Sequence, residues 1–298
     1  MLVLVLMGAG SKATSAVKRE CNRILSAVPC NMSSLDTACA ISAMLEDCPA
    51  TNAGTGSELN LDGVVECDAT VVFGPKKQSA SVIAVSGVKN PTQVCKKMLE
   101  RSATQGFSCP RLLVGNGARE YATLHQLELA ELETPRARDA FNYWKPQYPI
   151  ADTIGVIALN FEQIAACSSS GGSLLKFPGR GGPAGVLGAA CDISGNSAAA
   201  IVSGFGEDIT QVLLASRALE VEGLETLPEL MREFQLQRDP YFGVVRVRRE
   251  GQSVSVEYFH TTETMTFGYV NLSTNESRVI SSNTSLGVPV NGGFSVRI

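Results

Sequence analysis

The chain has 298 residues, of which 44% are apolar and 18% are charged, and its formal net charge is −4 at pH 7. Such a composition is typical of a globular protein with one large domain or two smaller ones, and the net charge argues against an electrostatic nucleic-acid binder. The chain lacks a basic leader and any apolar run near the roughly 20 residues of a membrane span, so we expect an intracellular protein of cytoplasm or nucleus.

In the first half of the chain, apolar periodicity predicts a buried strand at 2–7, an amphipathic helix at 11–28 and a buried helix at 34–47. A loop rich in Gly and Asn follows at 51–56. The remaining elements expected in this half are strands at 64–73 and 79–86, a helix from Asn90-Pro91 to about 101, and a short helix near 117–125.

The stretch from about 127 to 152 has a different composition. It contains Pro135, Pro146 and Pro149 among mixed charges, and it ends at Asp152. This pattern predicts a linker that is at least partly mobile, placed directly before an apolar strand.

The second half begins with a strand at 153–159. The elements expected after it are strands at 164–169 and 197–203, helices at 207–220 and 226–235, and three final strands at 242–249, 253–260 and 265–271 that complete the chain. Strands alternate with helices in each half, and neither half can bury a core alone. We therefore expect one α/β domain made from both halves.

Nine cysteines are present, but no CxxC pair accompanies them, and the chain has only two histidines. Zinc sites need closely paired soft ligands, so we expect reduced cysteines packed as small apolar groups and no metal or cofactor. The glycine-rich run 171–188 matches neither GxxxxGK[ST] nor GxGxxG, and GxSxG and HExxH are absent.

One threonine stands out by its context. Thr153 follows the acidic Asp152 and opens an apolar strand. An internal Thr hydroxyl is a poor nucleophile, but a Thr at a chain terminus carries its own base, an α-amine with a pKa of about 7.7–8.0. Cleavage between Asp152 and Thr153 would thus activate this side chain.

Further polar groups after Thr153 have both functional and ordinary interpretations. Ser168–Ser170 ends a strand and either serves catalysis or caps a turn. Arg180, flanked by glycines, either binds a carboxylate or forms a surface ion pair. Ser203 and Gly204, between a strand and a helix, either stabilise an oxyanion or form a plain turn.

The order of these segments resembles the N-terminal-nucleophile hydrolases of the type 2 asparaginase family, and most closely their threonine aspartase branch, the taspases. The segments that carry the resemblance are 45–61, 66–69, 86–91, 127–131, 152–156, 169–172, 176–180, 203–207 and 260–269. The resemblance implies a four-layer αββα sandwich and self-cleavage between Asp152 and Thr153. An α part, 1–152, and a β part, 153–298, would stay together, and two such units would form a homodimer.

The resemblance also assigns roles to individual residues. Thr153 would be the nucleophile, and Ser170 the second active-site hydroxyl. Ser203 and Gly204 would be the oxyanion positions. The remaining assignments are Asn52 beside the nucleophile, Arg180 on the substrate aspartate carboxylate, and Lys12 as a functional lysine.

Two departures from asparaginases sharpen the hypothesis. Pro183 stands where asparaginases have an Asp that holds the free α-amine of the substrate, and Asp152 stands where they usually have Gly. Both favour a threonine endopeptidase that cleaves protein substrates after aspartate. By resemblance, these substrates would be trithorax-type methyltransferases and the transcription factor IIA precursor. The alternatives are an L-asparaginase or isoaspartyl dipeptidase and, in another class, an unprocessed binding protein without catalysis.

Overall fold

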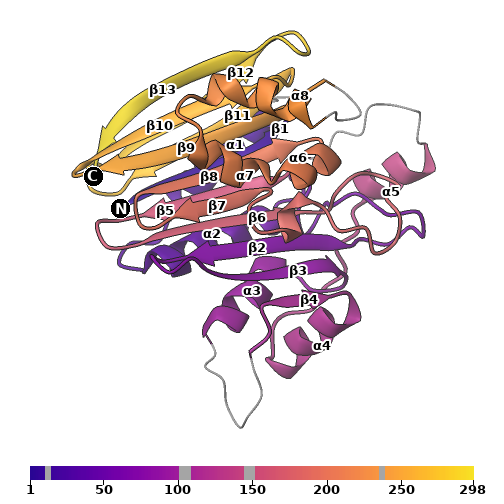
Figure 1. The fold of residues 1–298 in the computed structure, drawn as a ribbon. Helices are drawn as coiled ribbons and strands as arrows, with labels where there is room; N and C mark the ends of the chain where they lie inside the picture. Colours follow the sequence, from indigo (N-terminus) through magenta and orange to yellow (C-terminus); the bar gives the residue numbers. More distant parts are fainter. Residues whose placement is uncertain (11–14, 101–108, 144–151, 235–238) are drawn as a thin grey trace.

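A computed structural model describes residues 1–10, 15–100, 109–143, 152–234 and 239–298, and its described elements form two β-sheets with eight α-helices around them (Figure 1). Lys12 and the segment 144–151 before the expected cleavage site lie outside the described residues. None of the described helices has the length and apolar character needed to cross a membrane.

The larger sheet joins strands from both halves of the sequence. Its order is β12 (Glu276–Asn283), β11 (Thr264–Asn271), β1 (Leu2–Ala9), β5 (Ile154–Leu159), β6 (Ile164–Ser170), β2 (Cys67–Phe73), β3 (Gln78–Val85) and β4 (Leu112–Val114). Neighbouring strands are antiparallel except for the parallel pair β3 and β4. Because β1 pairs with β11 on one side and β5 on the other, the two halves complete each other's sheet.

The smaller sheet comes entirely from the second half. Its order is β13 (Val290–Arg297), β10 (Ser253–His260), β9 (Phe242–Glu250), β8 (Ala198–Gly204) and β7 (Cys191–Ser194), all antiparallel. Its inner face packs on the larger sheet through a shared apolar core. Strand β8 thereby brings its residues close to the larger sheet.

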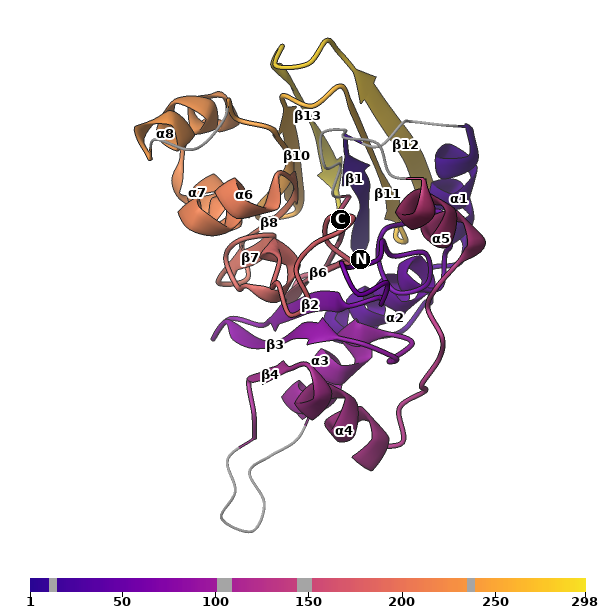
Figure 2. The same ribbon diagram turned by 90° about the vertical axis from the view of Figure 1, so that its right-hand side faces the viewer.

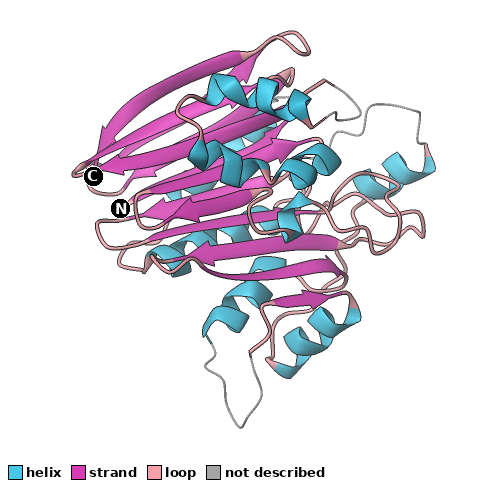
Figure 3. Ribbon diagram, viewed as in Figure 1, coloured by secondary structure: helices cyan, strands magenta, loops and turns pink. Residues whose placement is uncertain are grey.

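Helices cover the outer faces of both sheets (Figures 2 and 3). Helices α1 (Ser15–Ser26), α2 (Ser34–Glu46) and α3 (Pro91–Glu100) share an apolar core with the larger sheet. Helices α6 (Gly206–Val212), α7 (Leu214–Glu220) and α8 (Leu227–Glu233) share another with the smaller sheet. Helices α4 (Asn116–Leu124) and α5 (Pro135–Asn142) come from the middle of the amino-acid sequence.

Strand β1 explains why the chain begins with an unbroken apolar run. Leu2, Leu4 and Leu6 contribute to the core between the sheets, while Val3 and Val5 contribute to the core under the helices. Alternate side chains point to opposite faces of a strand, so a strand covered on both faces needs apolar residues at every position.

The structure corrects several predicted elements. The expected helix 207–220 is two helices, because Leu213 adopts a left-handed conformation with φ of +53° between α6 and α7. The expected linker 127–152 contains α5, which begins after the N-cap Thr134, whose hydroxyl oxygen accepts from the Ala137 nitrogen. A side-chain cap of this kind supplies one of the acceptors that the first turn of a helix lacks.

The chain also has strands that the sequence analysis did not predict. They are β4, β7, β12 and β13, and the last two lie beyond residue 271, where the last predicted strand ends. Both β12 and β13 are edge strands, and β12 is largely polar and lacks the apolar alternation that marks a half-buried strand. Strand β13 does alternate, with Val290, Phe294 and Val296 on its less exposed face, but its two central glycines weaken the signal.

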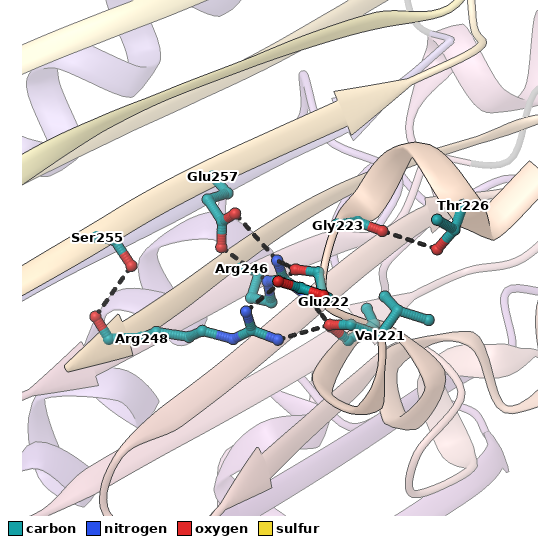
Figure 4. A network of polar contacts seen from close by, with 9 residues as sticks. Val221, Glu222, Gly223, Thr226, Arg246, Arg248, Ser255 and Glu257 are labelled. Carbon is teal, nitrogen blue, oxygen red and sulfur yellow. Dashed lines mark hydrogen bonds and ion pairs between the residues drawn. The ribbon is translucent and has the colours of Figure 1, made fainter. Parts of the chain in front are cut away.

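Two arginines of β9 fasten the C-terminal end of α7 to the smaller sheet (Figure 4). The fully buried Arg246 donates to the carbonyl oxygens of Ala218, Val221 and Glu222 over 2.7–2.8 Å and forms a two-pronged ion pair with Glu257. Arg248 donates to the carbonyls of Val221 and Glu222 as well. These cations satisfy carbonyls at the negative end of the helix dipole.

Candidate active site

Thr153 lies where the two sheets meet. It directly precedes β5, its exposed fraction is 2%, and its backbone nitrogen donates to the hydroxyl oxygen of Ser203 on β8 over 3.1 Å. The nitrogen of Ala9, at the end of β1, donates to the same oxygen over 3.1 Å. Ser203 of the smaller sheet therefore fixes the ends of two strands of the larger sheet.

The bond before Thr153 is packed against a glycine. At Gly8, where φ is +124°, an added Cβ would lie 2.7 Å from Oδ1 of Asp152. At Gly10, where φ is +104°, it would lie 2.5 Å from the hydroxyl oxygen of Tyr241. The Gly8-Ala9-Gly10 turn thus leaves room for an acidic and a phenolic side chain next to the expected cleavage site.

Tyr241 donates from its hydroxyl to Oε2 of Glu263 over 2.9 Å. Burial, followed by the hydrogen bond to Glu263 and the charges of Glu263 and Asp152, raises the pKa of Tyr241 above its usual value. The phenol therefore stays protonated at neutral pH and acts as a hydrogen-bond donor.

Ser170 and Thr153 lie at neighbouring strand ends. In the register of β5 and β6, Ile154 pairs with Ser169, and Thr153 and Ser170 are the next residues beyond that pair. The hydroxyl oxygen of Ser170 accepts from the nitrogen of Gly172 over 3.0 Å. The β-strand pairing thus brings the two hydroxyl residues of the predicted site together.

Asn52 holds the turn that follows Ser170. Its side-chain amide donates to the carbonyl of Gly172 over 2.8 Å, and its backbone carbonyl accepts from the nitrogen of Gly171 over 2.7 Å. Its side-chain oxygen accepts from the nitrogen of Glu58 over 2.9 Å. Asn52 is therefore tied into both its own loop and the turn after β6.

The loop that carries Asn52 is bonded to the backbone of Glu46, a residue whose carboxyl group is buried. Glu46, the last residue of α2, is 0% exposed; its carbonyl accepts from Thr55 over 2.7 Å, and its carboxylate accepts from the nitrogen and hydroxyl of Thr92. Burial raises the pKa of Glu46 from 4.5 to about 7, although the hydrogen bonds from Thr92 oppose this effect. The sequence analysis assigned no role to Glu46.

The guanidinium group of Arg180 has one edge that is paired and one that is free. Nε and Nη2 both donate to Oε1 of Glu207, over 3.0 and 2.6 Å, whereas the buried Nη1 has no hydrogen-bond partner among the described residues. A Cβ at Gly182 would lie 2.8 Å from Nη1, and one at Gly206 would lie 2.6 Å from Nη2. Glycines therefore give the guanidinium its space, and the free edge suits a carboxylate.

Pro183 also borders Arg180. A Cβ at Gly206 would meet Cδ of Pro183 at 3.0 Å and Nη2 of Arg180 at 2.6 Å, so the proline ring lies beside the guanidinium. An apolar ring cannot accept a hydrogen bond from an ammonium group. The nearby carboxylate of Glu207, whose side chain is 52% exposed, can do so.

Two buried charges complete the surroundings of Arg180. Asp68 is 0% exposed, and its oxygens accept from the nitrogens of Ala84 and Gly182 over 2.8 and 2.7 Å. Lys176 is 6% exposed, and its Nζ donates to the carbonyl of Glu66 over 2.8 Å. Burial raises the pKa of Asp68, against the opposing charges of Lys176 and Arg180. The spacing of Lys176 and Arg180 in the glycine-rich run could have pointed to both cations.

The structure thus brings most of the predicted site residues to one end of the facing sheets. Gly204, with φ of +147°, directly follows Ser203, and a Cβ there would lie 2.4 Å from the carbonyl oxygen of Tyr241. Gly172 connects the turn held by Asn52 with Arg180, because a Cβ at Gly172 would lie 3.1 Å from Nη1. Lys12 cannot be placed, since it lies outside the described residues.

Comparison with known proteins identifies the family of this chain. A family model described as asparaginase matches residues 6–149 and 146–280. A plant-type L-asparaginase of Pyrococcus horikoshii is 33% identical over 208 residues, covering 63% of this chain and 66% of the relative. The chain thus spans slightly less than two thirds of that archaeal protein's length.

Two further relatives are covered more fully. An isoaspartyl peptidase/L-asparaginase of Mus musculus is 30% identical over 253 residues, which is 76% of this chain and 75% of the relative. An isoaspartyl peptidase of Salmonella typhimurium is 29% identical over 244 residues, 74% and 76% of the two chains. The chain therefore belongs to the type 2 asparaginase family of N-terminal-nucleophile hydrolases.

Proposed function

We propose that this chain cleaves itself between Asp152 and Thr153 and that Thr153 then acts as the nucleophile of an amide hydrolase. The observation that carries the proposal is the hydrogen bond from the Thr153 nitrogen to Ser203, because it places the future α-amine in a buried, fixed position. Ser170, at the end of the neighbouring strand, supplies a second hydroxyl.

The chemistry follows from the α-amine. This amine accepts the hydroxyl proton of Thr153, and Oγ1 attacks the carbonyl carbon of the substrate amide. The hydroxyl of Ser203 and the N–H of Gly204 stabilise the negative oxygen of the tetrahedral intermediate. The intermediate collapses to an ester as the α-ammonium group of Thr153 gives its proton to the departing amine. Water then hydrolyses the ester, and Thr153 regains its proton.

Arg180 sets the substrate class in this proposal. Its free Nη1 edge receives the carboxylate of an aspartyl group, while Glu207 holds the other edge in place. A two-pronged or charge-assisted bond of this type is among the strong hydrogen bonds in proteins.

We propose further that the enzyme is an endopeptidase that cuts protein substrates after aspartate. Pro183 supports this, because the space beside Arg180 that it fills offers no carboxylate to a free substrate amine. The αββα sandwich, the homodimer and the nuclear protein substrates named above, trithorax-type methyltransferases and transcription factor IIA precursor, belong to the same proposal.

An L-asparaginase or isoaspartyl peptidase is the second candidate, and the names of the relatives favour it. The carboxylate of Glu207 beside Arg180 also supports it, because it could bind a free α-amine. In that case the substrate would be a small molecule with its own amino terminus.

Self-cleavage is tested on the purified full chain by a denaturing gel and N-terminal sequencing. We expect two fragments, one of which begins at Thr153, and none from Thr153→Val. A wild-type chain that stays intact at 298 residues after long incubation would overturn the proposal and favour a non-catalytic binding protein.

Substrate class is tested with two variants. Arg180→Ala should abolish cleavage of a peptide with an internal aspartate while the fold is retained. Glu207→Gln keeps an oxygen that can accept from Arg180, so it should retain most of that cleavage. If the second candidate is correct, wild-type protein releases ammonia from asparagine, and Glu207→Gln loses this activity.

A further inference from the structure

A second cation lies next to the free edge of Arg180. Gly172 adopts φ of +72°, and a Cβ built on it would lie 3.1 Å from Nη1 of Arg180 and 3.4 Å from Nζ of Lys176. The two charged nitrogens therefore approach one point that glycine leaves without a side chain. That point belongs to the turn after Ser170, which lies at the strand end next to Thr153.

Lys176 is an unusual lysine for this position. Its side chain is buried, whereas lysine is almost never fully buried unless it is paired. Its Nζ donates a hydrogen bond to a neutral group, the carbonyl of Glu66. An ammonium group has three donors, so Nζ can bind a further acceptor.

The charges around Arg180 indicate what the positive charge of Lys176 does. Arg180 is already paired with Glu207, and the carboxylate of Asp68 lies 3.0 Å from the Cβ position of Gly182, which is 2.8 Å from Nη1. Two negative groups next to one cation would repel an incoming carboxylate. The positive charge of Lys176 offsets that of Asp68.

We propose that Lys176 determines specificity by binding, together with the free edge of Arg180, the carboxylate of the aspartyl substrate. This inference rests on the proposed function. It predicts that the site distinguishes aspartate from asparagine, because only the charged side chain gains from a second cation.

The test is a binding measurement on the processed protein. Calorimetry compares two tripeptides that are identical except for a C-terminal aspartate or asparagine, so that the aspartyl peptide corresponds to a cleavage product. Lys176→Gln keeps a donor for the Glu66 carbonyl and removes the charge. We expect the preference of wild-type protein for the aspartyl peptide to fall about tenfold in this variant.

Matched variants separate substrate binding from support of the fold. Lys77→Gln removes a different lysine, one that pairs with the buried Asp192 over 2.7 Å, and should leave the preference unchanged. Lys176→Arg keeps the charge and should retain most of the preference. A purely structural defect would weaken both peptides equally.

The possible results separate the role of Lys176 from the aspartate specificity of the proposed function. An unchanged preference in a folded Lys176→Gln protein, or equal weakening of both peptides, would overturn the role of Lys176 and leave the proposed function intact. Equal binding of the two peptides by wild-type protein would overturn the aspartate specificity itself.

Discussion

The hydroxyl oxygen of Ser203 accepts a hydrogen bond from the backbone nitrogen of Thr153 over 3.1 Å. The two residues lie on different sheets, and the same oxygen also accepts from Ala9 at the end of β1. With both lone pairs engaged, the hydroxyl of Ser203 has its own proton left to donate. The contact therefore holds the junction between Asp152 and Thr153 in place and leaves the Ser203 hydroxyl beside it as a hydrogen-bond donor.

Ser203→Ala should slow the appearance of the fragment that begins at Thr153 by about 100-fold, the effect typical of losing one oxyanion donor. A time course on denaturing gels measures the rate. Ser168→Ala is the matched control, because Ser168 is another buried strand serine, and its hydroxyl donates to the carbonyl of Ala184 over 3.1 Å. Equal cleavage rates in both variants would show that Ser203 takes no part in the reaction.

Gly8→Ala should impair self-cleavage, because the new Cβ would lie 2.7 Å from Oδ1 of Asp152 and push the aspartate out of position. Gly251→Ala provides the control: its φ of +62° is also positive and costs about 1 kcal/mol for alanine, but no atom lies within 4 Å of the new Cβ. Fragment yields from both purified proteins are compared. Normal cleavage in Gly8→Ala would show that the packing of Asp152 is unimportant.

Glu46 should make stability depend on pH. Its pKa is raised from 4.5 to about 7 by burial, so the folded protein binds more protons than the unfolded chain between these values. The free energy of unfolding should therefore be highest below about pH 4.5 with respect to this group and fall by about 3 kcal/mol in total as pH rises from there through 7.

Urea unfolding at pH 5 and pH 7.5 measures this change. Glu46→Gln cannot ionise and still offers an acceptor to Thr92, so its stability should lack the decrease assigned to Glu46. The same slope in wild type and variant would show that other groups cause the pH dependence.

Arg246→Met should lower the free energy of unfolding by about 3–5 kcal/mol, because it leaves Glu257 and the carbonyls at the end of α7 without their buried partner. Arg217→Met, which removes an exposed pair with Glu220, should cost at most about 1 kcal/mol. Urea unfolding compares the two. Similar small losses in both variants would contradict the supporting role of Arg246.

The order of secondary structure was largely predictable where apolar periodicity is strong. The apolar run at the start of the chain predicted strand β1, and the change from a Pro-containing stretch to an apolar strand predicted a junction just before Ile154. Edge strand β12 was not predictable from the same signal because its sequence is mostly polar, and the two central glycines of β13 weaken its apolar alternation. The break at Leu213 was equally hidden, since leucine has no intrinsic preference for positive φ.

The residue types at the site can be recognised in the amino-acid sequence alone: Asp152 before Thr153, and Arg180 among glycines. Which of these groups meet depends on the tertiary structure. Ser203 reaches Thr153 because the two sheets pack face to face, and Lys176 approaches Arg180 because Gly172 has no side chain between them. Contacts between distant segments depend on strand register and sheet packing, which local sequence patterns do not specify.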